Sequence, residues 1–274
     1  MDIKSIKNRA DEVLMPYKTQ FVRVLAIVLV LQIIPSLFEG DNLVGILSSI
    51  LSIIFLPVTH GIIVSALKIV RNNGQSVNDE DGIVGFKRFG ELFPTYIASS
   101  FVIFLVIFVF MFIAGIIIAA VFQGNVDSIA NLATTGVSVE VIAQILLSHP
   151  ANVTLMIVIV VCAMLLMFFV EAYLMAVPYL LEQYHITGFN AVKTSFKMIK
   201  AHIMDYIKWF FSFFGWIFLA GIIEGILSEL ISFGAVVTLL VGLFKIVTYL
   251  PRYYISQTVL FEEIAFYYFD QVGE

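Results

Sequence analysis

The stretch FVIFLVIFVFMFIAGIIIAAVF, residues 101–122, contains no charged residue and no side chain that forms strong hydrogen bonds. About 20 apolar residues in a helix are enough to cross the hydrocarbon core of a bilayer, since each residue adds about 1.5 Å. An uninterrupted apolar run of this length is typical of a membrane span. The stretch therefore predicts a transmembrane helix.

The composition of the whole chain points the same way. Its 274 residues are 61% hydrophobic and 13% charged, whereas soluble domains have roughly 45–50% apolar and about 25% charged residues. One soluble core cannot hide this excess, so we predict an all-α polytopic bundle in a single membrane domain, residues 1–274. The single cysteine, Cys162, lies within an apolar run, which excludes a disulfide framework and a cysteine-rich metal site.

Six apolar runs are long enough to span a bilayer. The predicted spans are residues 19–38, 43–70, 93–122, 153–181, 206–226 and 231–250.

The basic residues are segregated along the chain. All fifteen lie at the N-terminal side of the first span, at every second connection, or at the end of the last span. The alternate connections, 39–42, 123–152 and 227–230, contain none. Since lysine and arginine are retained on the cytoplasmic side, both termini are predicted to be cytoplasmic.

Residues 188–203, GFNAVKTSFKMIKAHI, have the pattern of an interfacial helix. At about 100° per residue the apolar side chains gather on one face, with a basic stripe beside it formed by Lys193, Lys197 and Lys200. Lys87 and Arg88 lie in a similar segment, DGIVGFKRFGELF, before the third span. These five residues are candidate contacts for anionic lipids at the cytoplasmic face, the alternative being a general positive-inside anchor.

Two further segments and a possible repeat complete the predicted organisation. The outer loop, 123–152, contains SVEVIAQILLSH, which predicts a short surface helix, and residues 252–269 form a C-terminal amphipathic segment. The order of span, basic amphipathic segment and span occurs twice in the same direction, which favours a parallel internal repeat.

Two ionisable residues are predicted to lie deep in the membrane. His60 in the second span and Glu171 in the fourth lie at similar distances from the basic ends of their helices. Pro57 and Pro178 lie near them and are predicted to kink these helices. An intramembrane pair of His60 and Glu171 in a polar cavity or a proton path is one interpretation. A structural interhelical hydrogen bond, or a glutamate that reaches water, is the other.

No enzyme motif is evident in the sequence. The chain contains neither a phosphate-binding glycine loop nor a GxSxG or HExxH motif, and its four histidines are far apart. We therefore predict no enzyme activity, no cofactor and no metal site. The membrane accounts for the lysines, so no nucleic-acid partner is predicted.

Several short motifs nevertheless occur in a characteristic order. They are DGIVGFKRF with Phe86, VEAYLMAVPYLLEQY, AVKTSFKMIKAH with Ala191, Ser195 and Met198, SFFGW with Gly215 and Trp216, YLPRYY with Pro251 and Tyr253, and FYYF with Phe266 and Tyr267.

In this order, from about residue 57 to 269, the chain resembles a bacterial six-span membrane family, domain of unknown function nine-seven-five. That family in turn resembles the membrane domain of some glycerophosphodiester phosphodiesterases. The chain departs from the family at Lys200 or Ala201, where a glycine is usual, and it lacks a Pro-Gly pair at the start of the fourth span. The resemblance implies a protein of the bacterial cytoplasmic membrane and supplies no catalytic residue.

The sequence thus predicts a non-enzymatic membrane protein that handles a small solute, ion or peptide in transport, export or immunity. The alternative is a membrane scaffold or lipid-interacting protein without a translocation path. A membrane-protein partner and a homo-oligomer are both left open.

Overall fold

The computed structural model describes residues 1–38, 43–71, 76–121 and 150–272, and throughout these ranges it contains helices and no strand. The predicted all-α class is therefore confirmed. The longer helices are α1 (Ile3–Leu14), α2 (Lys18–Ile33), α3 (Leu43–Ile54), α4 (His60–Arg71), α6 (Phe89–Val121), α9 (Pro150–Leu174), α10 (Val177–Tyr184), α11 (Gly188–Phe211), α12 (Phe214–Leu230), α13 (Gly234–Thr248) and α14 (Leu250–Val272). The shorter ones are η1 (Met15–Tyr17), η2 (Pro35–Phe38), η3 (Leu56–Thr59), η4 (Asp79–Ile83) and α5 (Val84–Lys87). The surface helix predicted in the loop 123–152 lies outside the described residues.

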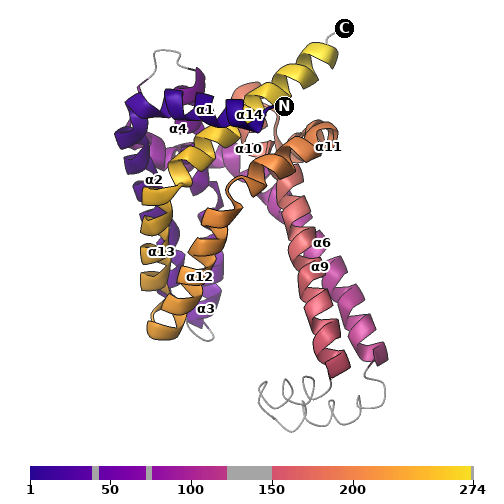
Figure 1. Ribbon diagram of the computed structural model, residues 1–274. Coiled ribbons are helices and arrows are strands. Elements are labelled where there is room, and N and C mark those ends of the chain that lie inside the picture. Colours follow the sequence, from indigo (N-terminus) through magenta and orange to yellow (C-terminus); the bar gives the residue numbers. More distant parts are fainter. Residues whose placement is uncertain (39–42, 72–75, 122–149, 273–274) are drawn as a thin grey trace. The chain divides into compact units, whose positions relative to one another are not determined.

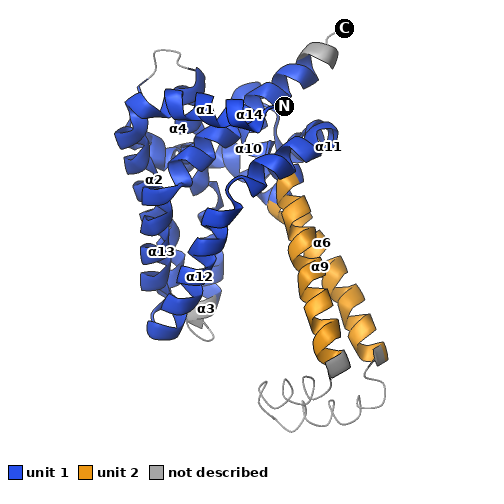
Figure 2. Cartoon of the chain, viewed as in Figure 1, with its two compact units in different colours: residues 1–99, 173–274 blue, residues 100–172 orange. Residues whose placement is uncertain are grey.

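The chain forms two compact units, coloured separately in Figure 2. Unit 1 comprises residues 1–99 and 173–274, and unit 2 comprises residues 100–172.

Unit 1 has a layer of mutually contacting helices, α1, α4, α10, α11 and α14. Helices α2, α3, α12 and α13 extend from one side of this layer (Figure 1). The layer carries lysines and arginines on α1, α4, α11 and α14. The sequence predicted such a gathering of basic residues at one membrane face.

The centre of this layer is well packed. Trp209 of α11 is fully buried and donates from Nε1 to the hydroxyl of Ser256 on α14 at 2.9 Å. Tyr179 of α10 stacks on Phe261 of α14, with ring centroids 4.6 Å apart, and both rings are fully buried. Each such side chain contributes about 1.5–3 kcal/mol by leaving water, so α14 is a core element rather than a loose tail.

The second predicted span, 43–70, is not one continuous helix. The structure divides it into α3, the short η3 and α4, with Pro57 in the first turn of η3. Proline ends the helix before it because its nitrogen lacks a hydrogen and its ring clashes with the preceding turn. From His60 to Val70 every α4 residue except Lys68 is buried, so α4 is enclosed by protein rather than by lipid.

The fourth, fifth and sixth predicted spans also differ from the structure in their bounds. Helix α9 ends at Leu174 and α10 starts at Val177, with Pro178 in its first turn. Helix α11 runs from the interfacial segment to Phe211, with a kink at His202, and meets α12 at 58°. Helices α13 and α14 meet at 63°. Among the described residues four helical segments are long and apolar enough to span a membrane, or up to six if each bent pair is one span.

Unit 2 consists of the parts of α6 and α9 between residues 100 and 172. Large apolar side chains are exposed on all sides of both helices, among them Phe104, Phe108, Phe112, Ile157 and Met164. A helix that is apolar all round needs an apolar environment, which a bilayer supplies.

Candidate functional site

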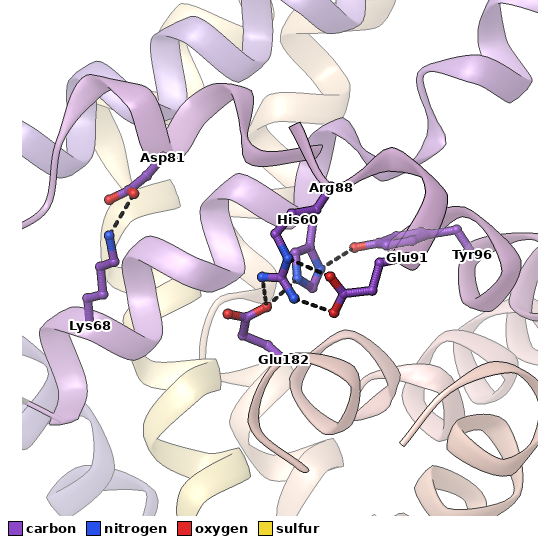
Figure 3. A network of polar contacts seen from close by, with 7 residues as sticks. All are labelled: His60, Lys68, Asp81, Arg88, Glu91, Tyr96 and Glu182. Atoms are coloured by element: carbon purple, nitrogen blue, oxygen red, sulfur yellow. Dashed lines mark hydrogen bonds and ion pairs between the residues drawn. The ribbon is translucent and has the colours of Figure 1, made fainter. Parts of the chain in front are cut away.

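A network of polar side chains surrounds His60, the first residue of α4, which is its most buried ionisable residue. Its side chain is 0% exposed. Nδ1 lies 3.1 Å from the hydroxyl of Tyr96 on α6, and Nε2 lies 2.9 Å from Oε2 of Glu182 on α10 (Figure 3). A neutral imidazole has one donor and one acceptor nitrogen, and an ionised carboxylate only accepts. We therefore assign the proton to Nε2, which donates to Glu182, and leave Nδ1 to accept from Tyr96.

Arg88 joins this pair to a second carboxylate. One guanidinium nitrogen donates to Oε2 of Glu182 at 2.6 Å, and two others donate to Glu91 at 2.9 and 2.6 Å. The hydrogen bonds to Glu91, supported by those to Glu182, raise the pKa of Arg88 above its usual value although burial opposes this. Arg88 is therefore a permanent cation in the network.

Exposure falls along the network from Glu91 to His60. The side chain of Glu91 is 46% exposed, that of Arg88 30%, that of Glu182 22% and that of His60 0%. On the far side of His60 lies Tyr96 of α6, whose hydroxyl is the partner of Nδ1. The polar chain thus leads from an accessible carboxylate to a buried imidazole and on to the hydroxyl of Tyr96.

Two glycines hold the segment 81–85 directly against residues 57–61. A Cβ on Gly61 would overlap the carbonyl oxygen of Asp81, and one on Gly85 would overlap that of Pro57. Asp81 is fixed by Lys68, whose Nζ lies 2.7 Å from Oδ1 (Figure 3). It also forms a capping box with Asn78. This close backbone contact brings Arg88 to His60.

The structure places the residues predicted from the sequence in different settings. His60 is in the network, whereas Glu171 is an exposed residue of unit 2, and the pairing of the two stays a prediction. Both His60 ring nitrogens already have partners within unit 1. Pro57 and Pro178 lie at breaks between helices.

The candidate contacts for anionic lipids divide into exposed lysines on α11 and two residues, Lys87 and Arg88, that are bonded to carboxylates. Lys193, Lys197 and Lys200 are exposed on α11. The hydrogen bond from Lys87 lowers the pKa of the exposed Glu80 carboxyl. The guanidinium of Arg88 points to two carboxylates rather than to a lipid phosphate.

Sequence reasoning missed Glu182, Tyr96 and Glu91. Glu182 and Glu91 each lie near the basic end of a span, among residues that we assigned to the connections. The sequence did contain a signal for these two glutamates. Each stands near the basic end of a span, where a lysine or arginine is close enough to form an ion pair. No group of three metal-binding side chains occurs among the described residues.

The fold and the network define an all-α membrane protein with a charged cluster at the basic end of its helices. Residues 1–241 match a family described as "Protein of unknown function (DUF975)". The match covers most of the chain, so the chain belongs to this family. No curated protein and no solved structure matches it.

Proposed function

We propose that this protein is a non-enzymatic protein of the bacterial cytoplasmic membrane, with both termini inside, that moves a small solute or ion. In this proposal the His60 network takes up and releases a proton during the cycle. The observation that carries the proposal is the imidazole of His60, fully buried between Tyr96 and a carboxylate that is partly exposed.

The direction of the hydrogen bonds supplies a mechanism. When His60 takes up a proton both ring nitrogens become donors, so Nδ1–H now donates to the Tyr96 oxygen. The Tyr96 hydroxyl must then direct its hydrogen away from His60. A proton that arrives through Glu182 thereby reverses the hydrogen bond between His60 and Tyr96.

The charges of the network favour such a step. With neutral His60, one fixed cation, Arg88, faces two carboxylates, Glu182 and Glu91. A proton on His60 would balance the second carboxylate. Tyr254, a further ionisable residue near Tyr96, is a phenol and is neutral near neutral pH.

A specific observation favours the alternative, a scaffold without a translocation path. Helix α4 is enclosed by protein, and Gly61 and Gly85 are packed against backbone. In this second proposal the network is a fixed clamp that joins α4, α6 and α10.

A flux measurement separates the two proposals. Purified protein is reconstituted into liposomes loaded with potassium, valinomycin sets a membrane potential, and a pH-sensitive dye reports proton movement. We expect proton uptake above that of empty liposomes, reduced to the empty-liposome rate by His60→Gln and strongly reduced by Tyr96→Phe. Glu80→Gln is the matched control, because it removes an exposed carboxylate with a basic partner outside the network.

Proton movement equal to that of empty liposomes, or unchanged in His60→Gln, would contradict a proton-coupled function. The clamp would be supported if the parent protein shows no proton flux and the His60→Gln and Tyr96→Phe variants lose thermal stability.

A further inference from the structure

A cavity of about 380 Å³ lies in unit 1 between the end of α2, η2, α3 and η3. Polar side chains line it from each of these elements: Gln32, Ser36, Ser48, Ser52 and Thr59. None of the described residues that line it is charged. An anion would therefore find no cation to pair with among these residues.

The serine hydroxyls in this cavity have already donated their hydrogens. Ser36 donates to the carbonyl of Ile33 at 2.8 Å, Ser48 to that of Pro35 at 3.0 Å, and Ser52 to that of Ser48 at 2.9 Å. A hydroxyl has one donor and two acceptor positions. Each of these oxygens therefore has only acceptor capacity left for a ligand, and a ligand that binds the serines must donate.

An aromatic ring adds a second preference. Phe55 lines the same cavity and is held edge-on against Phe86, with ring centroids 5.1 Å apart. Aromatic faces attract ammonium groups, and acceptor oxygens bind their N–H groups. An ammonium group on a short carbon chain satisfies both.

We propose that this cavity binds a primary ammonium group, carried either by the headgroup of an aminophospholipid or by a small soluble amine. The inference rests on the proposed function, since it names the class of solute that the network would serve. Thr59 connects the two sites: it lines the cavity and directly precedes His60 in the chain.

The test uses the full chain in nanodiscs made only of phosphatidylglycerol. Binding of ethylammonium chloride is followed by saturation-transfer NMR, with sodium chloride at equal ionic strength as the reference. Native mass spectrometry on nanodiscs that contain phosphatidylethanolamine as well measures which lipid is retained. Ethylammonium binding in the first arm identifies a soluble amine, whereas selective retention of the aminophospholipid alone identifies a lipid headgroup.

Ser48→Ala and Ser52→Ala are each expected to weaken the binding by roughly two- to tenfold, the worth of one hydrogen bond. Ser228→Ala is the matched control: the Ser228 hydroxyl also donates to the carbonyl four residues earlier, at 2.8 Å, but does not line the cavity. Gln32→Leu on the opposite wall tests the same site without changing α3. Thermal unfolding of each variant shows that it is folded.

The absence of both ethylammonium binding and aminophospholipid retention would overturn the inference, as would equal losses in Ser52→Ala and Ser228→Ala. These outcomes are distinct from a failure of the proposed function. Proton flux that depends on His60 without amine binding refutes the cavity alone, and amine binding without flux refutes the proton step alone.

Discussion

At the residue scale, the site depends on the partners of His60. The imidazole contacts Tyr96 and Glu182, which come from segments far away in the sequence. Burying an imidazole without partners would cost free energy, because its polar nitrogens would lose water. The network therefore couples the stability of α4 to α6 and α10.

The first prediction concerns this coupling. Glu182→Gln is expected to lower the free energy of unfolding by about 1–3 kcal/mol, since it leaves Arg88 and His60 with a neutral partner. The effects of Glu182→Gln and His60→Gln are expected to be non-additive by more than about 0.5 kcal/mol, as for residues in one network. Thermal unfolding in detergent is measured for the parent protein, the two single variants and the double variant.

The corresponding cycle with Glu171→Gln is the comparison. Because both ring nitrogens of His60 have other partners, we expect the effects of Glu171→Gln and His60→Gln to add. Non-additivity here would instead support the pair that the sequence predicted.

The second prediction concerns Gly85. Gly85→Ala is expected to destabilise the protein by about 1–3 kcal/mol, because the added methyl group overlaps the backbone at Pro57 and forces the segments apart. Gly90→Ala is the control, since a Cβ there meets no atom within 4 Å and Gly90 lies in α6. That change is expected to be neutral or to stabilise by up to about 1 kcal/mol. Equal unfolding temperatures for the two variants would contradict the close packing.

At the scale of elements, one order of features occurs three times among the described residues. In the chain, α3, α9 and α13 each end shortly before a proline, Pro57, Pro178 and Pro251, and a further helix follows: α4, α10 or α14. The sequence predicted instead two copies of a repeat that starts with a span and continues with a basic amphipathic segment and a second span. Proline explains the recurrence, because it ends one helix and is well tolerated in the first turn of the next.

The third prediction concerns α11. Its buried side chains include Ala191, Ser195 and Met198, while Phe189 and Phe196 are 59% and 49% exposed beside the lysine stripe. Exposed aromatic rings next to lysines are typical of a helix at a membrane interface. Replacing Lys193, Lys197 and Lys200 with glutamine is expected to weaken binding of anionic lipid by about 1 kcal/mol per charge at most.

Native mass spectrometry of the protein with phosphatidylglycerol measures this change. Lys4→Gln with Lys18→Gln is the control for net charge, since both lysines are exposed on other elements. An equal loss per charge in the control would contradict a specific role for α11.

At the scale of the whole molecule, the basic residues and the apolar helices define two ends of unit 1. The charge distribution predicts that the layer of α1, α4, α10, α11 and α14 faces the cytoplasm. The connection 123–152 is then expected outside the cell.

The fourth prediction tests this orientation. In a Cys162→Ser background, a cysteine at Asp127 is expected to react with a membrane-impermeant maleimide in intact cells, whereas one at Asn190 is not. Asn190 is exposed at the start of α11, so burial would not prevent its labelling. Lysed cells provide the control, in which both cysteines react. Reaction at Asn190 in intact cells would reverse the orientation.

The sequence by itself determined that the chain is an all-α membrane protein, because hydropathy and helical period depend only on residues close together in the chain. It also predicted kinks near Pro57 and Pro178, since proline acts on its own helix. The tertiary structure alone decided that α4 is enclosed by protein and that His60 meets Glu182, a residue 122 positions away. An apolar run has the same sequence pattern whether lipid or protein surrounds it. The partner of a buried polar group depends on which helices pack together.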